Sequence, residues 1–223
     1  MDKQIVAQIR ENISKLKKPN VQLILSGKRK CGKDYVEQLI MERYGDLMKS
    51  FRISAPIKKA FADQHSLDYE MLLSASKYKE TYRQQMVEWS DSIRSIDANY
   101  FLRMTIDQCF THSTQSYPIW LLNDARRISD LNYFHDKSEI DIDHKNIITI
   151  RIVADPMVRM ERGYQFTEGI DDQITECGLD SYQQWDHIIH NNGTKDDLLK
   201  CLQPIFNAID TKIGIAQNYY LLN

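Results

Sequence analysis

Residues 21–34 carry the sequence Val-Gln-Leu-Ile-Leu-Ser-Gly-Lys-Arg-Lys-Cys-Gly-Lys-Asp, in which a run of β-forming residues leads into Gly27-x-x-x-x-Gly32-Lys33. An amphipathic helical pattern follows directly. Glycines at both ends of the loop let the backbone turn tightly, so that successive N–H groups can point at phosphate oxygens. Lys33 would reach the β- and γ-phosphates, and the helix would direct its positive end at them. The pattern predicts a phosphate-binding loop; the alternative is a glycine turn with a solvated lysine.

The interior of this loop is unusually basic, and the residue that follows its lysine is acidic. Lys28, Arg29 and Lys30 stand in sequence inside the loop, and Asp34 occupies the position after Lys33. In the common pattern that position is Ser or Thr, whose hydroxyl binds Mg²⁺. Because a carboxylate can also bind Mg²⁺, directly or through water, we expect metal use to be retained. Clustered cations can simply be solubilising, but beside a nucleotide site they suit highly anionic reactants.

Composition limits the classes of protein that need to be considered. The chain has 223 residues and a formal net charge of −2. This balance argues against general nucleic-acid or membrane binding, and no apolar run approaches membrane length. We expect a monomer by default. We expect it in the cytosol, because the final Tyr-Leu-Leu-Asn differs from a peroxisomal Ser-Lys-Leu signal. Four cysteines without paired spacing favour a reduced, intracellular protein without a structural zinc site: Cys31, Cys109, Cys177 and Cys201.

Short apolar runs alternate with helical patterns along residues 21–223, which favours a single α/β domain. We predict a five-stranded parallel sheet covered by helices on both faces. A helix over residues 33–44, ended by Gly45, should follow the first strand. Residues 1–20 carry apolar side chains at helical spacing and predict a helical extension before this domain. The expected strands are 21–26, 47–53, 119–122, 147–153 and 185–189.

Residues 54–112 form a helical region that is too long for a simple crossover, so we expect an inserted acceptor-binding lobe. If residues 78–94 form one helix, its large apolar side chains fall within about an 80° arc. Lys79, Arg83 and Arg94 border this arc. They either extend into solvent from the edge of a buried stripe or overhang a cleft and bind an anionic substrate. The apolar stripe, which we assign to the core, comprises Tyr78, Tyr82, Met86, Trp89 and Ile93.

Charged residues follow the third expected strand directly. Because ligands collect at the carboxyl ends of strands in open α/β sheets, Asp124, Arg126 and Arg127 should face the site. Asp124 is a candidate ligand of Mg²⁺ or its water shell; the alternative is a helix N-cap or turn carboxylate. Two adjacent arginines in extended chain point in different directions. We therefore expect one of them to bind phosphate and the other to form a structural salt bridge.

A short helix is predicted after the fourth strand, with Asp155 as its cap, proline in its first turn and Gly163 at its end. It would present Arg159 and Arg162 on one face. We interpret residues 156–180 as a mobile lid that would exclude water and bring guanidinium charge onto the transferred phosphoryl group. The alternative is an arginine pair on ordinary surface.

Together these features resemble the animal-type phosphomevalonate kinases, a branch of the P-loop kinases akin to nucleoside monophosphate kinases. The resemblance covers nearly the whole chain from residue 21 onward. It implies that the γ-phosphoryl group of ATP is transferred, with Mg²⁺, to mevalonate 5-phosphate in isoprenoid and sterol synthesis, giving mevalonate 5-diphosphate and ADP. The matching segments are 26–34, Tyr78-Lys79-Glu80, Asp124-x-Arg126-Arg127 and Gly169-x-Asp171-Asp172-x-x-x-Glu176-Cys177-Gly178-Leu179-Asp180.

The resemblance also implies roles for individual residues. Lys33 and Arg126 would stabilise the transition state, and Asp34 would serve catalysis through Mg²⁺, with Asp124 as a second metal ligand. Asn191 would contact bound ligand, although a turn asparagine is the alternative. The implied nucleotide-binding residues are Gly27, Lys28, Arg29, Lys30, Cys31, Gly32, Lys33, Asp34, Arg159 and Arg162. The implied substrate-binding residues are Lys58, Lys79, Arg83, Arg94, Arg127 and Asn191.

Two other interpretations are open. Another small-acceptor P-loop kinase, acting on a nucleoside monophosphate or dephospho-coenzyme A, would also suit the lid arginines. The predominance of Lys and Arg over residues 56–94 argues against a nucleobase acceptor. Alternatively, the protein binds ATP without turnover. The presence of the candidate catalytic residues argues against this interpretation: Lys33, Asp34 and Arg126.

Overall fold

The computed structural model describes residues 3–74, 77–111 and 113–214. Tertiary contacts divide the chain into two compact units. The helical unit combines Met1–Leu16 with Phe51–Thr114, and the sheet unit combines Lys17–Ser50 with Gln115–Asn223. The predicted acceptor lobe thus falls in the helical unit, and the phosphate loop falls in the sheet unit.

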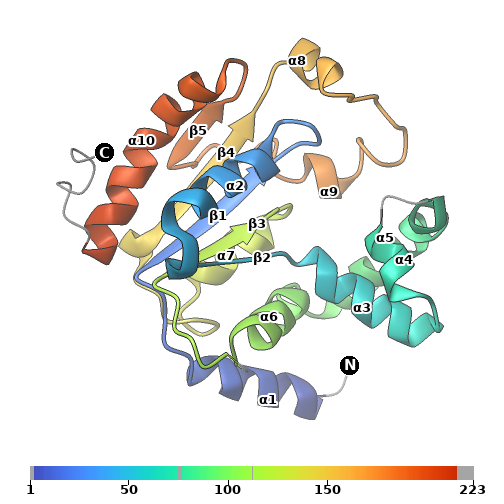
Figure 1. The fold of residues 1–223 in the computed structure, drawn as a ribbon. Coiled ribbons are helices and arrows are strands. Elements are labelled where there is room, and N and C mark those ends of the chain that lie inside the picture. The colour runs from blue at the N-terminus through green and yellow to red at the C-terminus, as the bar shows by residue number, and fades with distance from the viewer. Residues whose placement is uncertain (1–2, 75–76, 112, 215–223) are drawn as a thin grey trace. The chain divides into compact units, whose positions relative to one another are not determined.

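A five-stranded sheet forms the centre of the sheet unit, with the strand order β2-β3-β1-β4-β5 (Figure 1). β1 pairs in parallel with β3 and with β4, and β4 pairs in parallel with β5. In this register Val21 lies beside Ile119, and Gln22 lies beside Ile147. The predicted α/β fold with a parallel sheet is confirmed. The strands are β1 Val21–Gly27, β2 Met48–Phe51, β3 Ile119–Asn123, β4 Ile147–Val153 and β5 His187–His190.

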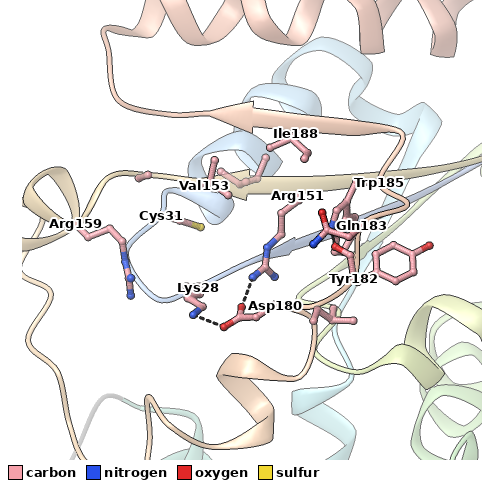
Figure 2. A pocket seen from close by; sticks show the side chains of 13 residues that line it. Lys28, Cys31, Arg151, Val153, Arg159, Asp180, Tyr182, Gln183, Trp185 and Ile188 are labelled. Atoms are coloured by element: carbon pink, nitrogen blue, oxygen red, sulfur yellow. Dashed lines mark hydrogen bonds and ion pairs between the residues drawn. The ribbon is translucent and has the colours of Figure 1, made fainter.

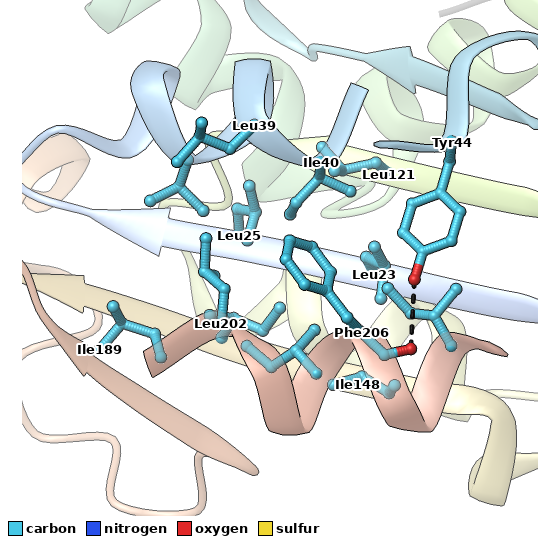
Figure 3. Packing of buried hydrophobic residues seen from close by; sticks show 14 of the residues in the cluster. Leu23, Leu25, Leu39, Ile40, Tyr44, Leu121, Ile148, Ile189, Leu202 and Phe206 are labelled. Atoms are coloured by element: carbon cyan, nitrogen blue, oxygen red, sulfur yellow. Dashed lines mark hydrogen bonds between the residues drawn. The ribbon is translucent and has the colours of Figure 1, made fainter. Parts of the chain in front are cut away.

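Helices cover both faces of the sheet, and the burial of β1 reflects this. All seven residues of β1 are buried, as expected for a strand that is covered on both faces. Leu23 and Leu25 pack with Ile40 of α2 and with Leu202 and Phe206 of α10 in one apolar cluster (Figure 3). α7 lies behind the sheet in Figure 1, on the side away from α2. The helices of this unit are α2 Lys33–Tyr44, α7 Ile128–His135, α8 Pro156–Glu161, α9 Ile174–Cys177 and α10 Lys195–Ile213, with short 3₁₀ turns at Gly45–Leu47 and His144–Asn146.

The helical unit has its own apolar centre. Phe61 and Leu72 are buried there, and Tyr82, Met86 and Trp89 of α5 pack against them. The prediction of one helix over residues 78–94 is confirmed. Four of the five residues of its predicted apolar stripe pack, partly buried, against this cluster: Tyr78, Tyr82, Met86 and Trp89. The amino-terminal helix belongs to the same unit, because Asn12 Nδ2 donates to Asp107 Oδ1 at 2.9 Å. The elements are α1 Lys3–Ser14, α3 Ser54–His65, α4 Tyr69–Leu73, α5 Lys77–Ile96, α6 Tyr100–Ile106 and a π-turn at Asp107–Thr111.

No helix among the residues that the structure describes combines the length and the apolar character that crossing a membrane requires.

Candidate active site

The phosphate loop connects β1 to α2, as the sequence predicts. Lys30 and Gly32 adopt positive φ angles of 63° and 90°, which turn the chain back over the end of β1. The carbonyl of Gly32 then accepts from the N–H groups of Tyr35 and Val36, both at 3.1 Å, and starts α2. The amino-terminal end of α2 therefore lies at the end of the loop, where its exposed N–H groups favour an anion.

The turn after β5 packs tightly against this loop. Asn191 is 5 % exposed, and its Nδ2 donates to the carbonyl of Cys31 at 2.9 Å. A Cβ on Gly32 would lie 2.1 Å from that nitrogen, so a side chain at this position would displace the Asn191 amide. Arg162 donates to the carbonyls of Cys31 and Asn191, at 3.2 and 2.9 Å. Asn191 thus supports the loop, and its predicted contact with bound ligand stays a prediction.

The side chain of Cys31 is buried under the loop to which this residue belongs. Its side chain is 1 % exposed, and a Cβ built on Gly27 would come 2.5 Å from the Cys31 sulfur and 2.8 Å from the carbonyl of Ile152. Burial raises the pKa of the Cys31 thiol. The thiol is therefore a buried packing group.

Lys33 is buried at the first turn of α2 and gathers three polar side chains around its ammonium group. It donates to Asn123 Oδ1 at 2.7 Å and to Asp34 Oδ1 at 3.0 Å, and it lies 3.6 Å from Asp124 Oδ1. Asp124 follows β3 with a φ of 83°. The structure brings Lys33, Asp34 and Asp124 together as the sequence predicts, and it adds Asn123 to them.

Arg126 joins the same group of charges from the segment after β3. Its Nε lies 2.6 Å from Asp124 Oδ1, and its Nη1 donates to Glu176 Oε1 at 2.8 Å. Burial by itself would lower the pKa of Arg126, but the two carboxylates outweigh burial and raise that pKa. Arg127 instead stands at the start of α7, where its backbone N–H donates to Asp130 Oδ2 at 3.0 Å. Which arginine binds phosphate stays a prediction.

Carboxylates of residues 171–180 pair with the side chains of Lys28 and Arg29 in the loop. Asp171 Oδ2 lies 2.9 Å from Arg29 Nη1, and Glu176 Oε2 accepts from the backbone N–H of Arg29 at 3.2 Å. Asp180 lies 2.5 Å from Lys28 Nζ. The segment predicted to be a lid thus contacts the loop through groups of opposite charge.

A pocket of roughly 310 Å³ opens beside these ion pairs, and Lys28 and Asp180 are in its wall (Figure 2). Arg151 projects into it from β4, donates to Asp180 Oδ1 at 2.9 Å, and lies 5.8 Å from the centre of the Trp185 ring. Burial lowers the pKa of the Arg151 guanidinium. The sequence signal for Arg151 is a charge inside the apolar run 147–153, a run that predicts a buried strand and by itself indicates no site residue.

Of the two predicted lid arginines, Arg159 lies on α8 and Arg162 is the C-cap residue of that helix; both contact the loop. Arg159 Nε donates to the carbonyl of Arg29 at 2.9 Å, and its guanidinium stacks on the Tyr164 ring at 3.8 Å. Asp155 is the N-cap residue of this helix, as predicted, although its side chain makes no cap bond. Its backbone N–H donates to Asn192 Oδ1 at 2.8 Å, so the turn after β5 anchors the start of α8.

The four remaining predicted substrate-binding cations belong to the helical unit. Arg83 forms two hydrogen bonds of 2.6 Å with Glu80, and Arg94 lies 4.9 Å from the centre of the Phe101 ring. Their binding of substrate stays a prediction. The four residues are Lys58 on α3 and Lys79, Arg83 and Arg94 on α5.

The fold and the site together define a class of protein. A phosphate loop between the first strand of a parallel sheet and its helix, with lysine and arginine side chains around it, is characteristic of the P-loop kinases. The crystal structure of TT1252 from Thermus thermophilus has a similar fold, with a TM-score of 0.50 and 14% sequence identity over 86% of this chain and 98% of that chain.

Sequence comparison identifies the family within this class. The sequence model of the family "Phosphomevalonate kinase" matches residues 25–140. The phosphomevalonate kinase of Drosophila melanogaster is 40% identical over 158 residues, which cover 71% of this chain and 80% of the fly protein. The chain belongs to the phosphomevalonate kinase family.

Proposed function

We propose that the protein transfers the γ-phosphoryl group of ATP to mevalonate 5-phosphate and releases mevalonate 5-diphosphate and ADP. Family membership supports the reaction. The observation that carries the proposal is the basic cluster at the phosphate loop, in which Lys33 and Arg126 share the carboxylate of Asp124 at 3.6 and 2.6 Å. Two anionic reactants need such a cluster in order to meet.

The acceptor explains why cations and not a general base dominate the site. A phosphate monoester has a second ionisation near pH 6, so its oxygen is already a nucleophile at neutral pH. The remaining barrier is repulsion between two polyanions and the need for in-line alignment. Lys33 and Arg126 would neutralise the charge that develops on the transferred group. Lys28 and Arg29 would bind the nucleotide phosphates from the loop.

Carboxylates hold several of these cations in the structure. Phosphate oxygens have the same charge and accept the same hydrogen bonds, so ATP can take the place of Asp171 on Arg29 and of Asp180 on Lys28. Lysine and arginine would then exchange one anionic partner for another without becoming buried and unpaired, which is the costly state for a charge. We propose that residues 156–180 move as a lid during this exchange.

The carboxylates beside Lys33 fit a magnesium ion. Mg²⁺ prefers oxygen ligands and is held in kinases by one or two carboxylates together with substrate phosphates. The side chain of Asp34 is 71% exposed, and the carboxylates of Asp34 and Asp124 lie 3.0 and 3.6 Å from Lys33 Nζ. When bound, the ion would supply charge neutralisation to the β- and γ-phosphates. Asp34 and Asp124 would hold it.

We further propose that the protein acts in the cytosol as a monomer. None of the four cysteines is in a disulfide, which suits a reducing compartment.

A coupled ADP-release assay tests the proposed reaction. ATP and Mg²⁺ are supplied with mevalonate 5-phosphate, and parallel reactions contain nucleoside monophosphates, dephospho-coenzyme A or no acceptor. We expect ADP release only with mevalonate 5-phosphate, together with mevalonate 5-diphosphate in the product by mass spectrometry. Faster turnover of a nucleotide acceptor would assign the protein to another small-acceptor kinase. ATP binding without transfer to any acceptor would assign it to the non-catalytic class.

A further inference from the structure

A buried polar chain lies beneath Lys33, and the proposed reaction does not use it. Asn123 ends β3 at 0 % exposure, and Glu37 lies one turn into α2 at 7 % exposure. Asn123 Oδ1 accepts a hydrogen bond from the Lys33 ammonium at 2.7 Å, and Asn123 Nδ2 donates one to Glu37 Oε2. Ser50 Oγ of β2 donates to the other oxygen, Glu37 Oε1. The chain therefore runs from β2 through α2 and β3 to the loop lysine.

Glu37 fixes which way the Asn123 side chain points. The Nδ2 group of Asn123 faces two carboxylate acceptors, Glu37 Oε2 and Asp34 Oδ1, the second at 3.2 Å. A reversed amide would place its two N–H donors against the Lys33 ammonium and its oxygen against the two carboxylates. All of these contacts would be repulsive. The carboxylate of Glu37 thereby keeps the amide oxygen directed at Lys33.

Holding the lysine with an amide has an electrostatic advantage. Asp34 and Asp124 are charged, and each reduces the positive charge that a phosphate would meet at Lys33. Asn123 is neutral and is the nearest acceptor, at 2.7 Å compared with 3.0 and 3.6 Å for the carboxylates. It can orient the ammonium without cancelling its charge. Such preorganisation of a cation toward developing charge is a large contribution to catalysis.

Packing alone does not explain the buried carboxylate. Removing a charged group from water is unfavourable unless its hydrogen bonds are made, and apolar residues of similar size commonly replace buried polar groups without loss of stability. We propose that Glu37 is a positioning residue, which acts through Asn123 to hold the Lys33 ammonium in place for phosphoryl transfer. This proposal rests on the proposed function only in using phosphoryl transfer as its readout.

A double-mutant cycle tests the proposal. Glu37→Leu keeps side-chain volume and removes the acceptor for Asn123, and we expect kcat to fall about ten- to hundredfold, the range for a lost hydrogen bond to a charged group. The KM for ATP should change less than about threefold. In the Asn123→Ala background, Glu37→Leu should lower kcat by less than about twofold further, because its effect passes through Asn123. Glu37→Gln, which keeps an acceptor oxygen, should restore most of the activity.

Asp210 provides the matched control. It is another buried carboxylate of the sheet unit, at 2 % exposure, and it accepts from Tyr44 Oη at 2.9 Å and from Arg43 Nη2 at 2.8 Å. Asp210→Asn should lower the free energy of unfolding and leave kcat unchanged. If Glu37→Leu behaves in the same way, the role of Glu37 is structural and the proposal is overturned. Independent, multiplicative effects of the Glu37 and Asn123 changes would also overturn it.

A second pair of variants applies if Glu37→Leu does not fold. Asn123→Asp keeps an oxygen for Lys33 but removes the amide donor and places a carboxylate beside Glu37, so kcat should fall. Adding Glu37→Gln returns an amide to the pair and should bring kcat back to within about fivefold of the wild-type value. If the double variant folds and its kcat does not recover, the proposal is refuted. The same ratios can be measured with any acceptor that the wild type phosphorylates, or on ATP hydrolysis. Failure of mevalonate 5-phosphate as acceptor therefore bears only on the proposed function.

Discussion

Replacing Gly32 by alanine tests how closely the phosphate loop fits the turn after β5. Gly32 has φ 90° and ψ 19°, a left-handed conformation that glycine adopts without strain. The added methyl carbon would lie 2.1 Å from Nδ2 of Asn191, which donates to the carbonyl of Cys31. A contact this short forces the Asn191 amide out of its position.

The expected loss of stability has two parts. The left-handed backbone costs an alanine about 1–2 kcal/mol. Displacing a buried amide from its hydrogen bond costs a further 1–3 kcal/mol or so. Gly32→Ala should therefore lower the free energy of unfolding by about 2–5 kcal/mol. Gly214 separates the two parts, because it has φ 76° and ψ 22° and its added Cβ would meet nothing within 4 Å. Gly214→Ala should cost only the first part.

Urea unfolding followed by tryptophan fluorescence measures both variants, with the free energy in water obtained by linear extrapolation. In the Asn191→Ala background the collision is absent, so Gly32→Ala should cost about as much as Gly214→Ala does. The Gly32 variant should also raise the KM for ATP, because its loop is displaced. Equal losses for Gly32→Ala and Gly214→Ala in the wild-type background would refute the reasoning. So would a Gly32→Ala loss that is unchanged when Asn191 is alanine.

Three further predictions concern the reaction and the cysteines. Lys33→Met should lower kcat about 100- to 1,000-fold with an unchanged circular dichroism spectrum, because it removes a preorganised cation; wild-type turnover would contradict its assignment. Arg83→Ala and Arg94→Ala should each raise the KM for the acceptor more than the KM for ATP in steady-state assays, and the reverse order would exclude them from the acceptor site. Iodoacetamide at pH 8 should modify exposed Cys201 well before buried Cys31, whose raised pKa leaves less thiolate, as peptide mapping would show; early labelling of Cys31 would contradict its burial.

Local patterns predicted the elements that position the site. The helix over residues 33–44 and the strand over residues 147–153 match the structure at both ends. Both carry strong local signals, since a glycine ends the helix and a nearly continuous apolar run marks a buried parallel strand. The last strand was predicted at 185–189 and lies at His187–His190. Trp185 does not pair in the sheet; its indole N–H donates to the carbonyl of Tyr182 at 3.0 Å.

The partners of the basic side chains could not be predicted in the same way. Periodicity and caps describe neighbours along the chain, whereas Lys28 meets Asp180, and Arg29 meets Asp171, across more than a hundred residues. Asp155 shows that a local signal can predict the position of a residue without predicting its hydrogen bonds. An Asp-Pro start favours a side-chain cap, but the residue holds the cap position without that bond while its backbone N–H pairs with Asn192.

The partners chosen by the fold explain how a chain of net charge −2 keeps a strongly basic site. Like charges that converge on one loop repel one another and are costly to desolvate unless each has a partner. Three carboxylates from one segment provide those partners. Asp171 pairs with Arg29 of the loop, and Glu176 pairs with Arg126 after β3. Asp180 pairs with both Lys28 of the loop and Arg151 of β4. The phosphates of ATP would then replace carboxylates that are already bound. On the proposed function, binding of the nucleotide would therefore be an exchange of anions. The segment that would give up the cations is the one that we propose to move as a lid.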